Sequence, residues 1–197
     1  MQRGHAIRPL ERAEDSQEPW VFLAGPIQGA ADWQAQAIEL LHAIDPVLNI
    51  ANPRSAEPFH GNWRAQVHWE SYYLRLAALT GCILFWGAEE QKHTCNRAYA
   101  QTTRFELGEW FALHQFLHCQ VVIGCHTRFT GMRYLCERYF FTPTESVRVH
   151  HNLEAVCTEA AARARMHTER GTRRESAFKD SPLNLNYYRQ FLENLLS

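Results

Sequence analysis

Five short, strand-like segments are the feature of this sequence that most constrains its fold. They lie at residues 20–24, 47–51, 82–86, 120–124 and 147–150. The first of them, 20–24, is continuously apolar, as is typical of a strand buried on both faces of a parallel sheet. An amphipathic, helix-like segment follows each of the five. The pattern therefore predicts an α/β fold: a doubly wound, flavodoxin-like sheet of five parallel strands with helices on both faces and an extra C-terminal helix.

The chain divides into one domain and two terminal segments. With 197 residues and 46% hydrophobic content it can bury one full core, which we expect over residues 19–168. Residues 1–18 are charged and polar, and we expect a flexible N-terminal arm there. Residues 169–197 hold a charged linker and an amphipathic helix over 185–196. A helix of that length is unstable alone in water, so it is expected to dock on its own domain or on another copy of the chain.

Charge and cysteine usage narrow the class of protein. The formal net charge of -1 argues against nucleic acid or an anionic membrane surface as the main partner. No apolar run reaches membrane-spanning length, and the charged N-terminus lacks a signal-peptide core. The six cysteines form no CxxC pair and mostly lie in apolar segments, as reduced, buried thiols do. The expected location is the cytoplasm.

Residues 101–110, with the sequence QTTRFELGEW, open the most apolar helix of the chain. Its apolar stripe predicts packing against a core, with Glu106 in the first turn. Free backbone N–H groups and the helix dipole there would favour an ionised carboxylate, the form that a nucleophile at a sugar carbon needs. An alternative stays open, because Thr103 and Glu106 also have the spacing of a capping box, which stabilises helices that carry no chemistry.

A second carboxylate, Glu70, interrupts the apolar stripe of the helix expected over 63–79. A buried charge is costly unless it is paired or functional, so Glu70 is a candidate for the same site. The alternative is that Glu70 lies at the edge of the stripe, reaches solvent and pairs with Arg75.

Two loops at predicted strand ends are candidates for ligand binding, because doubly wound folds hold ligands at the carboxyl ends of strands. Glycines in the first loop would let a ligand approach the backbone closely. The first loop contains Gly25, Pro26, Ile27 and Gln28, and the second contains Asn52 and Arg54. Ordinary turn chemistry is the alternative for both. The polar connection over 88–100 has the length of a lid or a binding loop.

The histidines do not predict a metal site. His114 and His118 are four residues apart on one helix, a spacing that can hold zinc, but no third ligand accompanies them at a recognised spacing. His114 also belongs to the apolar stripe. We therefore interpret both as structural histidines and expect neither a metal nor an organic cofactor.

Four motifs stand in a fixed order along the chain: VFLAGPI at 21–27, Trp69-Glu70, ILFW at 83–86 and TTRFELGE at 102–109. Together they resemble the nucleoside 2-deoxyribosyltransferase-like family, and the resemblance covers roughly residues 20–160. The resemblance implies that Glu106, directly before Leu-Gly, attacks the anomeric carbon of a deoxynucleoside. Glu70 matches the family's second acid, and the glycine turn would line the pocket for sugar and base.

The remaining site candidates are aromatic and polar residues near strand ends and within the motifs. Trp33, Trp63, Trp69 and Trp86 are expected to include the walls of a dry pocket in which a base stacks. The predicted substrate-binding residues are Gly25, Pro26, Ile27, Gln28, Trp33, Asn52, Trp69, Trp86, Gln101 and Gly108.

Several positions differ from the family pattern. Val21 or Phe22 replaces a tyrosine that touches the nucleophile, and Ala100 and Gln101 replace an aspartate that holds the 5′-hydroxyl. Gln28 stands where nucleotide-cleaving relatives favour a basic residue.

The expected activity is that of a homo-oligomeric pentosyltransferase that takes small-molecule nucleosides and nucleobases through a glycosyl–Glu106 ester. Two alternatives stay open: an N-glycosidase of nucleosides or their 5′-monophosphates, and a non-catalytic nucleotide-sensing module with the same fold.

Overall fold

The structure is a computed structural model that describes residues 4–13, 18–55, 62–93, 96–140, 147–171, 189–190 and 193–194. Within these residues, six parallel strands form one sheet in the order β1-β3-β2-β4-β5-β6. The strands are β1 (Ala6–Ile7), β2 (Trp20–Ala24), β3 (Asn49–Ala51), β4 (Cys82–Gly87), β5 (Val121–Cys125) and β6 (Val149–His150). The flavodoxin-like α/β fold is confirmed, since β2 to β6 lie within or at the five segments predicted as strands.

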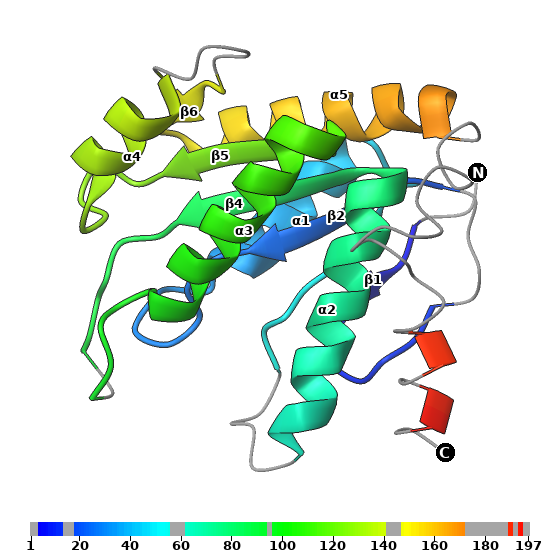
Figure 1. Ribbon diagram of the computed structural model, residues 1–197, viewed down its shortest axis with the longest axis horizontal. Coiled ribbons are helices and arrows are strands. Elements are labelled where there is room, and N and C mark those ends of the chain that lie inside the picture. The colour runs from blue at the N-terminus through cyan, green and yellow to red at the C-terminus, as the bar shows by residue number, and fades with distance from the viewer. Residues whose placement is uncertain are drawn as a thin grey trace.

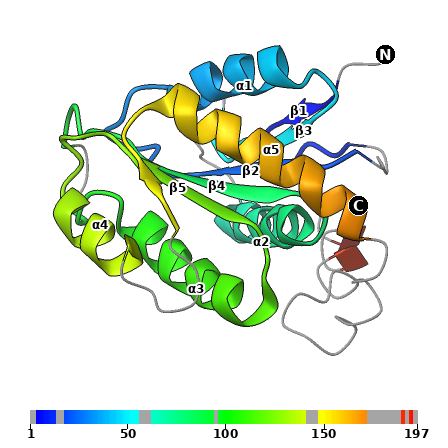
Figure 2. The ribbon, with the colours of Figure 1, turned by 90° about the horizontal axis from the view of Figure 1, so that it is seen from above.

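Helices cover both faces of the sheet (Figures 1 and 2). One face carries α1 (Trp33–Ile44) and α5 (Leu153–Gly171). The other face carries α2 (Trp63–Thr80), α3 (Gln101–Leu117) and α4 (Met132–Phe140). No helix within the described ranges is both long and apolar enough to cross a membrane.

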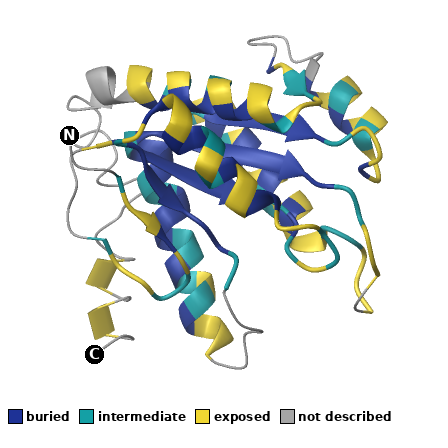
Figure 3. Ribbon diagram, turned by 180° about the vertical axis from the view of Figure 1, so that it is seen from behind, coloured by how far each residue is buried: buried dark blue, intermediate teal, exposed yellow. Residues whose placement is uncertain are grey.

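The continuous apolar runs arise because the sheet is buried on both sides. Along β2, Phe22 packs into the core beneath α2 and α3, whereas Val21 and Leu23 pack into the core beneath α1 and α5. Successive side chains of a strand point to opposite faces, so both sets must be apolar. Figure 3 shows the central strands buried along their length, with the exposed positions on the outer sides of the helices.

The N-terminal segment is partly built into the fold, which corrects the expectation of a flexible arm over 1–18. Ala6 and Ile7 pair with β3 as an edge strand, and Ile7 is buried. Farther along, the carbonyl oxygen of Glu11 accepts a hydrogen bond of 2.9 Å from Nε1 of Trp69. A strand of two residues is too short to leave an apolar run, and therefore the sequence pattern did not indicate it.

The C-terminal expectations are tested only in part. α5 continues to Gly171, past the expected domain boundary at residue 168. Residues 189–190 and 193–194 are helical, as predicted for 185–196, but most of that helix and of its linker lies outside the described residues.

The topology creates a crevice at the carboxyl end of β2. The chain leaves β2 through α1 on one face of the sheet and enters β4, the other neighbour of β2, from α2 on the opposite face. Ligands of open α/β sheets bind at such a switch point, outside the carboxyl ends of the strands.

Candidate active site

A cavity of about 730 Å³ opens at this crevice, on the side of the sheet that carries α2 and α3. Its walls come from the turn after β2, the loop after β3, one side of α2, the 88–100 connection and the first turns of α3. Small-molecule sites typically occupy about 300–1,000 Å³, so the cavity has room for a nucleoside. The predicted site residues that line it are Gly25, Pro26, Ile27, Gln28, Glu70, Gln101 and Glu106.

The two predicted acids, Glu70 and Glu106, share this cavity although they come from different helices. Oε1 of Glu70 accepts a hydrogen bond of 2.9 Å from Nε2 of Gln66, one turn earlier on α2. Burial raises the pKa of Glu70. Burial, and then the charges of Glu70 and Glu109, raise the pKa of Glu106 to about 8. Near neutral pH the pair therefore keeps a proton, because two like charges in a desolvated site disfavour each other.

The environment of Glu106 corrects two expectations. α3 begins at Gln101, and its N-cap is Ala100, which has φ of 54° and makes no side-chain capping bond. Glu106 thus lies in the second turn, and Thr103 is a buried residue of the cavity wall. The capping-box alternative is therefore wrong. The expectation that the helix dipole favours the ionised carboxylate is also wrong, since burial and Glu70 outweigh an effect confined to the first turn.

The glycine turn lines the cavity, and Trp33 supports it from behind rather than facing a ligand. Nε1 of Trp33 donates a hydrogen bond of 2.9 Å to the carbonyl oxygen of Pro26. A Cβ on Gly25 would lie 2.5 Å from the Trp33 ring and 2.4 Å from the carbonyl oxygen of Trp86. Gly25 is therefore required by close packing inside the protein, and the prediction that Trp33 binds substrate is not supported.

Three further predicted residues lie away from the cavity. Trp69 is fully buried in the core beneath α2, and Trp86 points into the core on the opposite face of the sheet. A Cβ on Gly108 would meet no atom within 4 Å, so this residue faces solvent on the outer side of α3. Periodicity explains these placements. On a helix, residues one or two positions from a cavity-facing residue point in other directions, and on a strand neighbouring residues point to opposite faces.

The four tryptophans therefore do not form a dry aromatic wall around this cavity, whereas Trp33 and Trp86 line a second, separate pocket. Of the four, Trp63 alone lines the cavity, and it is 67% exposed.

At the end of β3, Arg54 rather than Asn52 lines the cavity. Asn52 is buried, and its Oδ1 accepts a hydrogen bond of 2.9 Å from the backbone N–H of Arg54.

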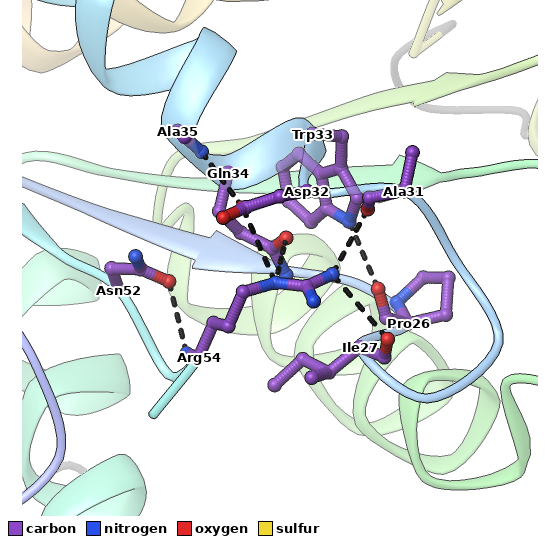
Figure 4. Close-up of polar contacts among 9 residues, drawn as sticks. All are labelled: Pro26, Ile27, Ala31, Asp32, Trp33, Gln34, Ala35, Asn52 and Arg54. Atoms are coloured by element: carbon purple, nitrogen blue, oxygen red, sulfur yellow. Dashed lines mark hydrogen bonds and ion pairs between the residues drawn. The ribbon is translucent and has the colours of Figure 1, made fainter. Parts of the chain in front are cut away.

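The guanidinium of Arg54 reaches the segment after β2, as Figure 4 shows. Nε donates to Oε1 of Gln34 at 2.9 Å, and Nη2 donates to the carbonyl oxygens of Ala31 at 2.9 Å and Ile27 at 3.3 Å. Asp32 adds an ion pair at 3.3 Å. Arg54 thus clamps the glycine turn to the neighbouring strand.

Sequence reasoning missed the cationic side chains at the other end of the cavity. The N–H of Gln91 donates to the carbonyl oxygen of Gly29 at 2.7 Å, which docks the 88–100 connection onto the glycine turn. Nη2 of Arg97 donates to Oε1 of Gln28 at 2.9 Å, and Lys92 also lines the cavity. The length and polarity of the connection indicated a binding loop, but they did not indicate which residues reach the site.

His114 of α3 is a structural histidine, as interpreted from the sequence. His114 is buried, and its Nδ1 lies 2.6 Å from the carbonyl oxygen of Cys119. Over the part of the chain that the structure describes, His, Cys, Asp and Glu side chains form no group of three or more that could hold a metal ion.

Comparison with known proteins adds no relative. A scan against models of protein families finds no match, and a search of curated proteins finds none either. The resemblance to nucleoside 2-deoxyribosyltransferases therefore stays a prediction, which rests on the order of the motifs.

The clamp made by Arg54 gives a first prediction. Arg54→Lys should lower the free energy of unfolding by about 1–3 kcal/mol, because an ammonium group cannot make the forked contacts of a guanidinium. The exposed Arg133 on α4 offers a matched control, and Arg133→Lys should change stability little. Denaturant unfolding measures both variants. Equal stability of the two would contradict the clamp.

The raised pKa of Glu106 gives a second prediction, which concerns how stability changes with pH. The native state keeps a proton up to a pKa of about 8, whereas the unfolded chain releases it near the ordinary value of 4.5. The contribution of Glu106 to stability is therefore full below about pH 4.5 and is lost as the pH rises toward about 8.

Glu106→Gln removes this dependence. Its melting temperature should therefore rise relative to that of the wild-type protein as the pH increases from about 5 to about 8. Glu109→Gln, on the exposed side of the same helix, keeps Glu106 and should keep most of the wild-type pH dependence. If the melting temperatures of Glu106→Gln and the wild-type protein changed with pH in parallel, Glu106 would not have a raised pKa.

Proposed function

We propose that the protein is a retaining pentosyltransferase of the nucleoside deoxyribosyltransferase type, which cleaves the N-glycosidic bond of nucleosides through a covalent ester on Glu106. The observation that carries this proposal is the pairing of Glu70 and Glu106 in one cavity beside the glycine turn. Two neighbouring carboxyl groups, of which one keeps a proton, supply what a retaining glycosyl transfer needs, one ionised nucleophile and one acid.

The reaction then has two steps. A carboxylate oxygen of Glu106 attacks C1′ of the sugar, the C1′–N bond breaks, and the leaving base takes a proton from Glu70. A second nucleobase then attacks C1′ of the ester, and the bond from C1′ to Glu106 breaks. The attacking nitrogen gives its proton to Glu70. Two displacements at the same carbon retain the configuration. Water as the second nucleophile would give hydrolysis instead.

The pKa of Glu106 sets a condition on the first step. With a pKa of about 8, Glu106 holds a proton near neutral pH. Attack requires its ionised form, so the proton must lie on Glu70 in the reactive complex. A bound sugar that donates a hydrogen bond to Glu106 would shift the proton in this direction, because a donor stabilises the ionised carboxylate.

The proposal includes a homo-oligomer in the cytoplasm that acts on small-molecule nucleosides and nucleobases without a cofactor. One local observation supports association. Trp63 and Val67 line the mouth of the cavity with exposed fractions of 67% and 46%. A second copy of the chain that covered these apolar side chains would also exclude water from the site.

Glu106→Ala should abolish base exchange. We expect the rate to fall about 10³-fold or more, because the nucleophile itself is lost. Glu109→Ala, on the exposed side of α3, should keep most of the activity. Chromatography of a 2′-deoxynucleoside incubated with a different free base measures the exchange. Wild-type turnover by Glu106→Ala would remove Glu106 from the mechanism. Binding without turnover by the wild-type protein would favour the non-catalytic module.

A second candidate function, an N-glycosidase of nucleoside 5′-monophosphates, is favoured by the cations at the glycine turn. Arg97 contacts Gln28, at the position where nucleotide-cleaving members of the family that the chain resembles favour a basic residue. Lys92 lines the same end of the cavity. A phosphate at this end could therefore meet a positive charge supplied by the 88–100 connection.

If a phosphate binds there, Arg97→Ala should raise KM for a deoxynucleoside 5′-monophosphate by about 10–100-fold, the value of one charge-assisted hydrogen bond. KM for the corresponding deoxynucleoside should not change. Arg133→Ala, at an exposed position of α4, is the matched control. Equal changes of KM for the two substrates would contradict a phosphate-binding role of Arg97.

A further inference from the structure

A second group of reactive side chains lies outside the cavity, where β5, α4 and β6 meet at one edge of the sheet (Figure 1). Cys125 ends β5 and is fully buried, Cys136 lies partly buried on α4, and His151 follows β6. None of the three lines the cavity that holds Glu106. Their chemistry is therefore separate from the proposed glycosyl transfer.

The ring of His151 contacts both cysteines. Its Nδ1 lies 3.3 Å from the carbonyl oxygen and 3.9 Å from Sγ of Cys125. Its Nε2 lies 3.9 Å from Sγ of Cys136. A carbonyl oxygen can only accept a hydrogen bond, which assigns the proton of the neutral ring to Nδ1. The lone pair is then on Nε2, the nitrogen that faces Cys136.

This arrangement gives the two thiols different roles. Sγ of Cys136 lies 3.6 Å from Sδ of Met132 and 3.9 Å from Nε2 of His151, and this nitrogen can take the thiol proton as a general base when the sulfur attacks. Burial, followed by the neighbouring thiol of Cys136, raises the pKa of Cys125 to about 12. Cys125 therefore stays a protonated thiol, and Cys136, which is only partly buried, is the sulfur that a reagent can reach.

We propose that Cys136 and Cys125 are a thiol pair that a hydroperoxide converts into an intramolecular disulfide. The sulfur of Cys136 attacks one oxygen of hydrogen peroxide, the O–O bond breaks, and the products are a sulfenic acid and water. The sulfur of Cys125 then attacks the sulfenic sulfur and the S–O bond breaks. The proton of Cys125 leaves with the hydroxyl group as a second water. Two thiols are oxidised by two electrons, and one peroxide is reduced.

The position of the pair connects it to the helix that carries Glu106. A link between residues 125 and 136 would close the segment that contains Phe129 and Thr130. Nη2 of Arg104, in the first turn of α3, donates to the carbonyl oxygen of Thr130 at 2.5 Å. The guanidinium also lies 5.0 Å from the centre of the Phe129 ring. The disulfide would therefore form at the base of the loop that holds the start of α3.

The test is oxidation of the full chain with hydrogen peroxide, followed by blocking of the remaining thiols and peptide mass spectrometry without reduction. We expect a linked peptide pair that contains Cys125 and Cys136, with a mass lower by two hydrogen atoms. In Cys125→Ser the sulfenic acid of Cys136 should persist and be trapped by dimedone. In His151→Phe, which keeps the ring shape without the base, oxidation of Cys136 should slow by about tenfold or more. Cys157→Ser is the matched control and should react like the wild-type protein.

Three results would overturn the proposal. One is a disulfide from Cys136 to a different cysteine, Cys95 included. Another is oxidation of Cys125 in Cys136→Ser at the wild-type rate. The third is an oxidation rate of Cys136 that His151→Phe leaves unchanged. Circular dichroism of each variant before treatment separates these outcomes from loss of fold.

Discussion

Two carboxyl groups in one partly buried cavity disfavour each other's ionised form, and the surrounding structure must hold them there. Each acid is adjacent in sequence to an apolar anchor. Glu70 follows Trp69, which is fully buried, and Glu106 precedes Leu107, which is 5% exposed. These anchors fix α2 and α3 against the same face of the sheet, so the acid beside each anchor is directed to the cavity. Core packing thus offsets the cost of placing the acids together, and the raised pKa of Glu106 is the remaining sign of that cost.

The opposite wall depends on the contacts that hold the glycine turn in place. The glycine turn is held from behind by Trp33 and from the side by Arg54. These contacts leave the turn's cavity-facing side open to a ligand. The 88–100 connection docks on the same turn through Gly29 and adds cationic side chains to it. The cavity therefore has two acids on the helices and, on the loops, cationic side chains together with Glu90. This suits a ligand that carries a sugar near the two acids and a polar or anionic group near the cations.

The sequence predicted the fold because burial on both faces of a sheet leaves continuous apolar runs. It predicted Glu70, Glu106 and the glycine turn as a group, since their motifs occur in a characteristic order. It did not predict β1, which is too short to leave a pattern. The directions of Trp69 and Trp86 depend on which face each residue occupies, and residue type alone does not specify this.

The protonation of Glu106 was also outside what a local pattern can show. Its position relative to the helix terminus suggested an ionised group. The pKa is instead set by burial and by Glu70, a residue distant in the chain that only the folded structure brings near. The same holds for Arg97, whose contact with Gln28 joins two loops far apart in the sequence.

The central claim is that a sugar becomes covalently attached to Glu106. A single turnover with a 2′-deoxynucleoside, without an acceptor base, should be stopped by acid and the protein digested for peptide mass spectrometry. The account predicts a deoxyribosyl group on the peptide that contains Glu106, and the loss of this adduct when a free base is added before the acid. A deoxyribosyl group on Glu70, or free deoxyribose released with no adduct at any time, would contradict it.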